Sequence, residues 1–308
     1  MRVIINEMDS TNQFVELILE NNKAIISPSL GCALRSLTIG QKEQSPKQII
    51  VGGDGNISPN EISDKTGSFL MIPWPNRILN GNLIVDNQKF ELPVNSDLFA
   101  IHGLLRERPW NICHQTANSV KCSIDLQSPW PFKGEVFYGA KIYEDRFVQS
   151  ISIKAGENKH PFPVGFGLHP WFKRDLGNGD SYLHIPGQKS VWILDENMVA
   201  TGEIKKPEGG LNFKEVQSPK TGLLDHCFEI IPETTSKIIW PDILTLKIQS
   251  SANMSFLQVY ASEGSLCVEP QSCAVDSFRL TREFKLDSGT IMLAPKQVVI
   301  AKTVWQWA

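Results

Sequence analysis

The chain has 308 residues, 41% of them hydrophobic, which is enough to bury a sizeable core. Its formal net charge of -3 argues against nucleic-acid binding and against attachment to an acidic membrane surface. No apolar run reaches the roughly 18 residues of a membrane-spanning helix, and the start lacks the apolar segment of a secretory signal. Six cysteines without a CxxC pair are typical of free intracellular thiols, so a cytoplasmic protein is expected.

The predicted elements are mostly β-strands, because apolar and polar residues alternate with a period of two. The alternation begins in FVELILEN at Phe14 and returns in KCSIDLQ at Lys121. Two strands with a turn at Glu144 and Asp145 follow in AKIYEDRFVQSISIKA. Later segments rich in β-branched and aromatic residues are SVWILDEN, SKIIW, LTLKIQSS and SFLQVYAS, and two last strands lie in GTIMLAPKQVVIAKTVWQWA.

Clusters of Gly, Pro, Asn and Asp separate these strands, and no amphipathic helix exceeds about two turns. Two polar stretches, 52–67 and 205–222, are short enough to be surface loops. Without a linker, a repeat or a low-complexity tract, one domain over residues 1–308 is expected. The pattern predicts an all-β fold, a large antiparallel sandwich or barrel with few short helices.

Two titratable residues interrupt apolar segments. His169 stands in GFGLHPWFKR, where Pro170 disfavours a helix, so His169 is expected to end an extended segment near a sheet rim. Taken alone, it is better explained as a hydrogen-bonded structural histidine than as a catalyst, although imidazole exchanges protons near neutral pH. Glu269 ends the apolar run of SLCVEPQS, and a buried carboxylate has a raised pKa unless it is paired. A general base and a salt-bridged structural acid explain Glu269 equally well.

Other polar residues have structural explanations when each is taken alone. Asn76 and Arg77 follow a stiff Pro-Trp-Pro segment in PWPNRILNG, and an arginine there binds either hydroxyls or a surface carboxylate. His102 in IHGLL fits a turn after a strand, as do Asp225 and His226 in GLLDHCF. Four basic residues near the histidines are expected to be solvated surface charges rather than a phosphate site: Arg106, Arg108, Lys173 and Arg174.

Neither a cofactor motif nor a metal motif is found. The sequence lacks the GxGxxG and GxxxxGK[ST] phosphate loops and the GxSxG nucleophile turn. Zinc is usually bound by three or four ligands that include a close sequence pair. His102 and His169 are isolated from other ligand types, and Asp225 and His226 would point to opposite faces of a strand. A metal site is therefore disfavoured.

Five segments, in their order along the chain, resemble the aldose 1-epimerase (galactose mutarotase) family: PWPNRILNG, IHGLL, GLHPWF, LLDHCF and VEPQS. The resemblance implies a galactose mutarotase-like β-sandwich, which agrees with the period-two pattern. It implies that Glu269 is the general base and His169 the general acid. It also implies a set of residues that hold the sugar hydroxyls: Arg77, His102 and Asp225, with Asn76 nearby. The segment SCAVDSF after Glu269 departs from the usual family pattern, which leaves the identity of the sugar open.

The implied reaction interconverts the α and β anomers of a free aldose. It oxidises nothing and releases no group, so no cofactor is expected. A carboxylate takes the proton of the anomeric hydroxyl, an imidazolium protonates the ring oxygen, and the open-chain aldehyde rotates before it closes again. Glu269 is therefore expected to be ionised and His169 protonated, on opposite sides of the sugar. Trp74 and Trp171 are candidates to cover the apolar face of the sugar, although core packing explains either one alone.

Two other functions stay open. A glycoside hydrolase would use Asp225 and Glu269 as its carboxylate pair, but it would give His169 no necessary role. A non-catalytic sugar-binding protein would keep the arginine, the histidines and the tryptophans without needing Glu269. The expected partner in each case is a small-molecule sugar, an aldohexose or related aldose including sugar phosphates. No nucleic acid or membrane partner is expected, and the sequence predicts no particular oligomeric state.

Overall fold

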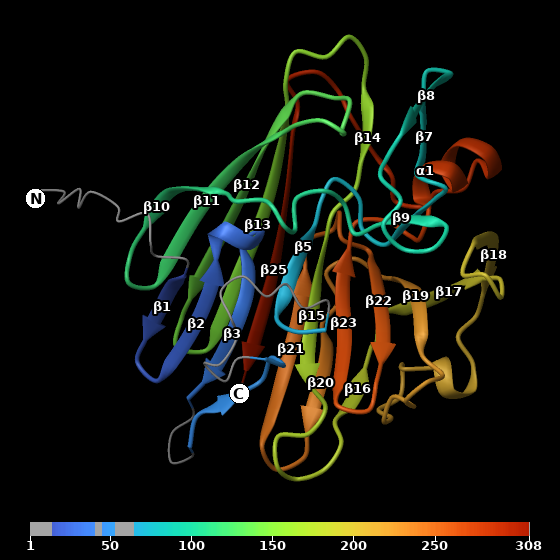
Figure 1. Cartoon of the computed structure of the whole chain (residues 1–308). Helices are drawn as coiled ribbons and strands as arrows, with labels where there is room; N and C mark the ends of the chain where they lie inside the picture. The colour runs from blue at the N-terminus through green and yellow to red at the C-terminus, as the bar shows by residue number, and fades with distance from the viewer. Residues whose placement is uncertain (1–13, 41–44, 53–64, 308) are drawn as a thin grey trace, which may run out of the picture.

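The computed structural model describes residues 14–40, 45–52 and 65–307, and its architecture is almost entirely β (Figure 1). Two large antiparallel sheets account for most of the strands, and three strand pairs stand outside them. Within the described part of the chain, no helix has the length and apolar composition needed to cross a membrane.

The larger sheet has eleven strands and carries the residues discussed below. Its order is β1-β2-β3-β5-β15-β23-β22-β19-β17-β18, with β4 against β3. The bounds along this order are β1 (Val15–Leu19), β2 (Asn22–Ser27), β3 (Ala33–Ile39), β5 (Ser68–Met71), β15 (Gly167–Lys173), β23 (Ser265–Gln271), β22 (Phe256–Ala261), β19 (Asp225–Ile230), β17 (Gln188–Leu194) and β18 (Ala200–Lys205), with β4 at Lys47–Gln48.

The second sheet has eight strands, in the order β10-β11-β12-β13-β25-β21-β20-β16. Their bounds are β10 (Asn111–Gln115), β11 (Ser119–Leu126), β12 (Gly134–Ile142), β13 (Arg146–Ala155), β25 (Val298–Trp307), β21 (Leu244–Ser250), β20 (Ser236–Trp240) and β16 (Tyr182–His184). The separate pairs are β14 (Phe162–Val164) with β24 (Ile291–Leu293), β6 (Arg77–Leu79) with β9 (Phe99–Ile101), and β7 (Asn82–Val85) with β8 (Gln88–Glu91).

Among the residues that the structure describes, helical structure is limited to short segments: η1 (Pro28–Leu30), η2 (Gly209–Leu211), α1 (Ser277–Arg279) and η3 (Leu280–Phe284). The segments predicted from alternation overlap the strands β1, β11, β12, β13, β17, β20, β21, β22, β24 and β25, although only the last three residues of β12 fall inside one. The predicted loop 52–67 lies largely outside the described residues. In the predicted loop 205–222, only the last residue of β18 and η2 belong to regular elements.

The core lies between the two large sheets, where aromatic side chains meet. Phe172 of β15 packs edge-on against Trp305 of β25, with ring centroids 5.1 Å apart. Trp305 also contacts Phe147 of β13, and none of the three side chains is exposed. Buried residues of both sheets belong to one large hydrophobic cluster. The prediction of a large antiparallel β-sandwich with few short helices is therefore confirmed, and a single domain over 1–308 stays a prediction.

The strands β15 and β23 are neighbours near the middle of the larger sheet, and their register brings two site residues together. The ladder pairs that flank the site are Gly167 with Gln271 and Trp171 with Cys267. In this register His169 falls opposite Glu269, and alternation directs both side chains to the same face of the sheet. The site is thus built on a central pair of strands rather than on loops.

His169 lies inside β15, whereas the sequence predicts that it ends an extended segment near a sheet rim. The strand continues through Pro170, which pairs with Ser68 of β5. Neither Pro170 nor Pro270 has an N–H to donate, so the ladder between β15 and β23 is interrupted beside His169. The prolines mark a break in hydrogen bonding rather than the end of the strand, and the site occupies that break.

Candidate active site

His169 and Glu269 meet at contact distance across β15 and β23. Nε2 of His169 lies 3.3 Å from Oε1 of Glu269. The other carboxylate oxygen, Oε2, accepts a hydrogen bond of 3.0 Å from Nε2 of Gln271. His169 is 7% exposed and Glu269 only 2%. The pair is therefore a buried proton donor and acceptor, and the hydrogen bond from Gln271 fixes the orientation of the carboxyl.

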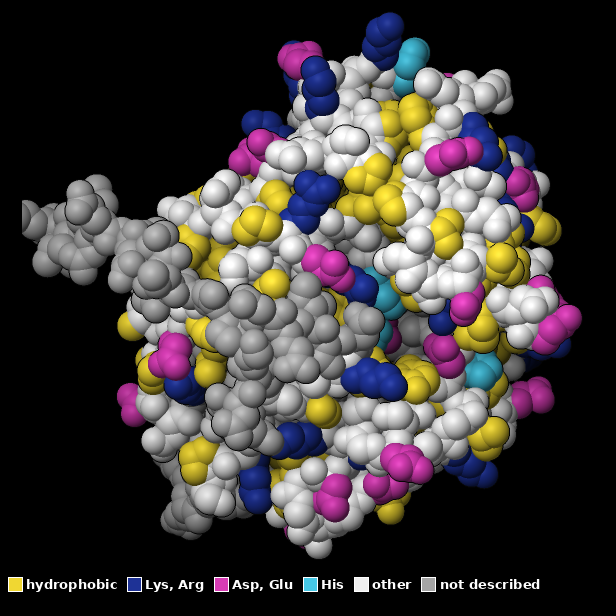
Figure 2. All heavy atoms as spheres, viewed as in Figure 1, with side chains coloured by type: hydrophobic (Ala, Val, Ile, Leu, Met, Phe, Trp, Pro, Cys, Tyr) yellow, Lys and Arg dark blue, Asp and Glu magenta, His cyan; other side chains and the backbone are white. Residues whose placement is uncertain are grey.

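The pair lines a small cavity of about 160 Å³. This is below the roughly 300 Å³ at which sites for drug-sized ligands begin, so the cavity suits a ligand as small as a monosaccharide. Figure 2 shows a hollow near the centre of this face, with histidine side chains in its wall and basic side chains at its edge. The lining consists of Asn76, Arg77, His102, His169, Trp171, Asp225, Gln258, Tyr260 and Glu269. Seven of the eight residues proposed from the sequence to contact the sugar are in this set, and Trp74 is the exception.

A tight backbone arrangement positions Asn76 and His102 at the cavity. Both have left-handed backbone conformations, with φ of 54° for Asn76 and 64° for His102. The backbone N–H of His102 donates to the carbonyl of Asn76 at 2.8 Å. Nη1 of Arg77 donates to the side-chain oxygen of Asn76 at 2.9 Å. Positive φ is uncommon outside glycine, with asparagine and histidine among the exceptions, so the sequence matches this unusual geometry.

Asp276, in the segment that follows β23, forms hydrogen bonds with the backbone of the short strand that carries Arg77. The backbone N–H of Asp276 donates to the carbonyl of Arg77 at 3.0 Å, and its Oδ1 accepts from the N–H of Leu79 at 3.3 Å. Burial raises the pKa of Asp276, which its bond from Arg279 opposes. The short strand that carries Arg77 is thus tied to the same chain segment that carries Glu269.

Arg77 and Asp225 place a donor and an acceptor at the more open side of the cavity. Nη2 of Arg77 lies 3.6 Å from Oδ2 of Asp225, and their side chains are 16% and 33% exposed. Oδ1 of Asp225 accepts a hydrogen bond from Nε2 of Gln258 on β22. The guanidinium and the carboxylate keep part of their hydrogen-bonding capacity for a ligand with neighbouring hydroxyls.

Aromatic rings hold the His169 imidazole on both sides. Phe69 of β5 stacks on it with centroids 4.5 Å apart, and Trp171 stacks at 5.3 Å. Trp171 lines the cavity, as predicted. Trp74 does not line it: its indole donates to the carbonyl of Ala100 and the side chain is 2% exposed. Core packing, the plainer of the two explanations, is therefore the right one for Trp74.

Burial dominates the titration of the pair. Burial, with smaller contributions from the guanidinium charges of Arg106 and Arg77, lowers the pKa of His169 from 6.5 to about 3. Burial also raises the pKa of Glu269 well above its usual 4.5, with the charge of Asp225 adding to the effect. Desolvation penalises both charged forms, so burial opposes the expected ion pair of ionised Glu269 and protonated His169 in the free protein. Both shifts favour a neutral imidazole beside a protonated carboxyl.

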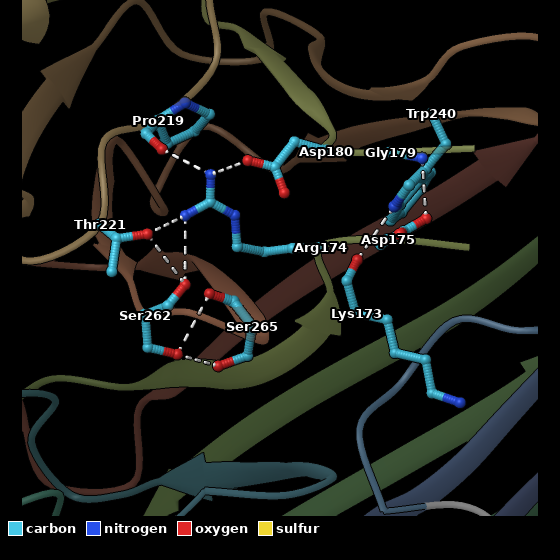
Figure 3. Close-up of polar contacts among 10 residues, drawn as sticks. All are labelled: Lys173, Arg174, Asp175, Gly179, Asp180, Pro219, Thr221, Trp240, Ser262 and Ser265. Atoms are coloured by element: carbon cyan, nitrogen blue, oxygen red, sulfur yellow. Dashed lines mark hydrogen bonds and ion pairs between the residues drawn. The ribbon is translucent and has the colours of Figure 1, made fainter. Parts of the chain in front are cut away.

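Arg174 is buried rather than solvated, which corrects the sequence-based expectation. Its guanidinium donates to the carboxylate of Asp180 and the carbonyl of Pro219, both at 2.8 Å, and to Ser262 at 3.1 Å (Figure 3). It also donates to Thr221. Arg174 therefore joins the chain before β19 to the turn between β22 and β23, and it does not line the sugar-sized cavity.

Arg106 lies beside the site, against the Phe69 ring. Its guanidinium carbon lies 5.4 Å from the centre of the Phe69 ring, the same ring that stacks on His169. Nη2 of Arg106 is also 3.2 Å from Oε1 of Glu107. Its positive charge contributes to the low pKa of His169 without lining the cavity.

Gln258 and Tyr260 line the cavity but were not predicted from the sequence. Their signal was present in SFLQVYAS, where alternation puts Phe256, Gln258 and Tyr260 on one face of a strand. An amide in the middle of an otherwise apolar strand needs a partner, and that partner is Asp225. The pattern identified the strand, but it did not identify which face meets the site.

Comparison with known proteins gives a consistent family assignment. The model of the aldose 1-epimerase family matches residues 15–299. An uncharacterized protein of Escherichia coli K12, YihR, is 31% identical over 219 residues, which cover 68% of this chain and 70% of that protein. The family model covers most of the chain, so the chain belongs to the aldose 1-epimerase family.

Solved structures share the fold at much lower sequence identity. A GalM/aldose epimerase homologue from C. elegans superposes with a TM-score of 0.81 at 16% identity, covering 96% of this chain and 98% of the other. A putative aldose 1-epimerase from Escherichia coli K12 gives a TM-score of 0.80 at 15% identity, with the same coverage. At these identities the similarity shows the galactose mutarotase-like fold alone.

Proposed function

We propose that the protein is a mutarotase that interconverts the α and β anomers of a free aldose in the cavity around His169 and Glu269. The observation that carries the proposal is the 3.3 Å contact between the imidazole and the carboxyl within a sugar-sized cavity. The anomeric hydroxyl and the ring oxygen are bonded to the same carbon, so the groups that exchange protons with them must lie close together. The contact of His169 with Glu269 puts both groups on one wall of the cavity, close enough to serve both oxygens. This arrangement supports the proposal more directly than the expected placement on opposite sides of the sugar.

In the proposed mechanism, the pair holds one proton before the ring opens and one again after the ring has opened. When sugar hydroxyls replace water in the cavity, the proton moves from Glu269 to His169, and the resulting carboxylate takes the proton of the anomeric hydroxyl. His169 then protonates the ring oxygen, the ring opens, and rotation about the first carbon–carbon bond exposes the other face of the aldehyde. Reversal of the same transfers closes the ring as the other anomer. Each positioned transfer contributes roughly 10²- to 10⁴-fold in rate.

The remaining polar residues are assigned to holding the sugar. Arg77 and Asp225 offer a donor and an acceptor for neighbouring hydroxyls, and His102 and Asn76 offer further polar atoms at the wall. Trp171 borders the cavity and is assigned to the apolar face of the ring. A cytoplasmic location and a small-molecule sugar substrate fit this function, and the family implies the latter.

The glycoside hydrolase alternative is less well supported. Asp225 is occupied by an ion pair with Arg77 and a hydrogen bond from Gln258, whereas Glu269 contacts His169. A two-carboxylate mechanism leaves that contact unexplained. A purely binding protein likewise has no use for a buried carboxyl with a raised pKa.

The test is polarimetry of freshly dissolved single anomers across a panel of aldoses and aldose phosphates. Glu269→Gln and His169→Asn should each lower the catalysed rate by at least about 100-fold. Glu263→Gln, an exposed residue in the turn between β22 and β23, is the matched control and should keep the wild-type rate. Wild-type rates in either site variant would refute the assignment. Release of chromophore from a glycoside would favour the hydrolase, and sugar binding without any rate enhancement would favour a binding protein.

A further inference from the structure

A third side chain with metal-binding chemistry lies against the His169–Glu269 pair. Cys267 is two residues before Glu269 on β23, so alternation puts both side chains on the same face of the sheet. One ligand atom from each of His169, Cys267 and Glu269 lies within 4.8 Å of the other two, and all three residues are buried. Across the described ranges, no other group of three His, Cys, Asp or Glu residues meets this spacing. The sequence-based search for ligand pairs overlooked C-x-E.

The distances between the three ligand atoms suit a small ion with tetrahedral coordination. Two ligands at the roughly 2.0–2.1 Å bond lengths of zinc to nitrogen and oxygen stand about 3.3 Å apart at a tetrahedral angle. His169 Nε2 and Glu269 Oε1 are 3.3 Å apart before any ion is bound. A thiolate at about 2.3 Å from zinc stands about 3.6 Å from such ligands. Since Cys267 Sγ lies within 4.8 Å of the other two atoms, it needs to approach by about 1 Å at most.

The donor set also selects the kind of ion. One sulfur, one nitrogen and one oxygen ligand match zinc and its thiophilic analogues, whereas magnesium and calcium prefer oxygen ligands alone. Gln271 holds the Oε2 atom of Glu269, which leaves Oε1 directed at the group. Nδ1 of His169 is buried without a hydrogen-bond partner, so no hydrogen bond at that atom opposes a small shift of the ring, within its aromatic stack, toward an ion. The fourth position would face the cavity that His169 and Glu269 line.

We propose that His169, Cys267 and Glu269 form a binding site for one Zn²⁺ ion, and that the ion and the sugar exclude each other. On binding, the Cys267 thiol and the Glu269 carboxyl release their protons to solvent, and His169 binds through a ring-nitrogen lone pair. The ion thereby occupies the two groups that the proposed mutarotation needs. Zinc is thus an inhibitor of this protein rather than its cofactor, and Cys267 is the residue that makes the inhibition tight.

Metal binding is tested without reference to catalysis. Chelator-treated protein is titrated with Cd²⁺, and the thiolate-to-metal charge-transfer absorbance is followed. The wild type should develop the band with one equivalent of Cd²⁺ per chain, and Cys267→Ser should lose it. Cys113→Ser is the matched control, because Cys113 is exposed and distant in sequence from the site, and it should keep the band. Absence of the band in the wild type, or its survival in Cys267→Ser, would overturn the proposal.

Inhibition is tested separately and rests on the proposed mutarotation. Zn²⁺ should raise the apparent KM for the sugar without changing kcat, because the two ligands compete for the same residues. Cys267→Ser should raise the zinc concentration that gives half inhibition at least tenfold, since even loss of a residue behind a metal ligand costs about 10- to 100-fold in affinity. Equal zinc sensitivity of the variant and the wild type would refute the role of Cys267. Failure of sugar turnover alone would count against the proposed function and leave the Cd²⁺ result standing.

Discussion

Protein stability at mildly acidic pH should depend on how many protons the His169–Glu269 pair binds. In the folded protein the pair holds one proton from the His169 pKa of about 3 up to the raised pKa of Glu269. In the unfolded chain, with reference pKa values of 6.5 and 4.5, the two groups also hold one proton between pH 4.5 and 6.5. Because the two states bind nearly the same number of protons near the middle of this window, and the small differences at its two ends cancel, the wild-type pair should add little net pH dependence to the free energy of unfolding across it.

Replacing one residue of the pair should reveal the pH dependence that the other gives to the free energy of unfolding. In Glu269→Gln, the unfolded chain protonates His169 as the pH falls below 6.5, but the folded state does not until about pH 3. The free energy of unfolding should therefore fall with a slope that approaches roughly 1.4 kcal/mol per pH unit, or by about 2.3 kcal/mol in all between pH 6.5 and 4.5. In His169→Gln the sign reverses. The folded state keeps the Glu269 proton that the unfolded chain loses above pH 4.5, so stability should fall as the pH rises toward the raised pKa of Glu269.

The assay is urea denaturation followed by tryptophan fluorescence at pH 4.5, 5.5 and 6.5, with a chelator present to keep the site free of metal. Each variant is compared with the wild type at the same pH, so that titrations elsewhere cancel. Glu263→Gln is the control, and its curve should run parallel to the wild type. Opposite slopes in the two site variants are the expected signature. A Glu269→Gln curve parallel to the wild type would refute the argument that burial keeps His169 neutral.

Three further predictions concern the site and its support. The kcat/KM of mutarotation in metal-free buffer should change little between pH 7 and pH 5, because the His169 pKa is about 3, and an acid limb centred near 6.5 would contradict this. Gln271→Leu removes the hydrogen bond to Glu269, and since a bond to a charged group contributes roughly 1.5–3 kcal/mol, kcat should fall by about 10- to 100-fold with little change in KM. Gly103→Ala should lower the free energy of unfolding by more than about 2 kcal/mol in thermal or urea denaturation, because φ is +73° and the new Cβ would lie 2.1 Å from a backbone carbonyl oxygen. Gly264→Ala, with no atom within 4 Å of its added Cβ, should stay within about 0.5 kcal/mol of the wild type, and an equal loss in both variants would contradict the steric argument.

Most of the sheet structure could be predicted because period-two alternation is a local property. Each half-buried strand, such as β20 or β21, shows its own apolar face in the sequence whatever its neighbours are. Seven of the residues that line the cavity could also be predicted, because they occur in five short segments that resemble one family. That His169, Arg77 and Asp225 share a single cavity is visible only in the structure.

What could not be predicted depends on cross-strand register and on burial. The contact of His169 with Glu269, and the proximity of Cys267 to both, follow from how β15 and β23 align. The protonation of the pair depends on how completely the surrounding sheets exclude water, which no local pattern reports. Arg174 looked like a surface charge for the same reason: its partners come from chain segments distant in sequence.

The fastening of β6 by Asp276 has a consequence for how substrate preference can change in this protein. Only a few residues separate the strand of Glu269 from the backbone that anchors Arg77, so the proton-transfer group and this arginine cannot shift independently. Asp225 is different, because it lies at the start of β19 beside an exposed connection that contains Leu223. Redesign for a bulkier ligand should therefore vary the exposed positions around Leu223. It should leave intact the Asp276 anchor and the bonds of Arg174 to Pro219 and Thr221.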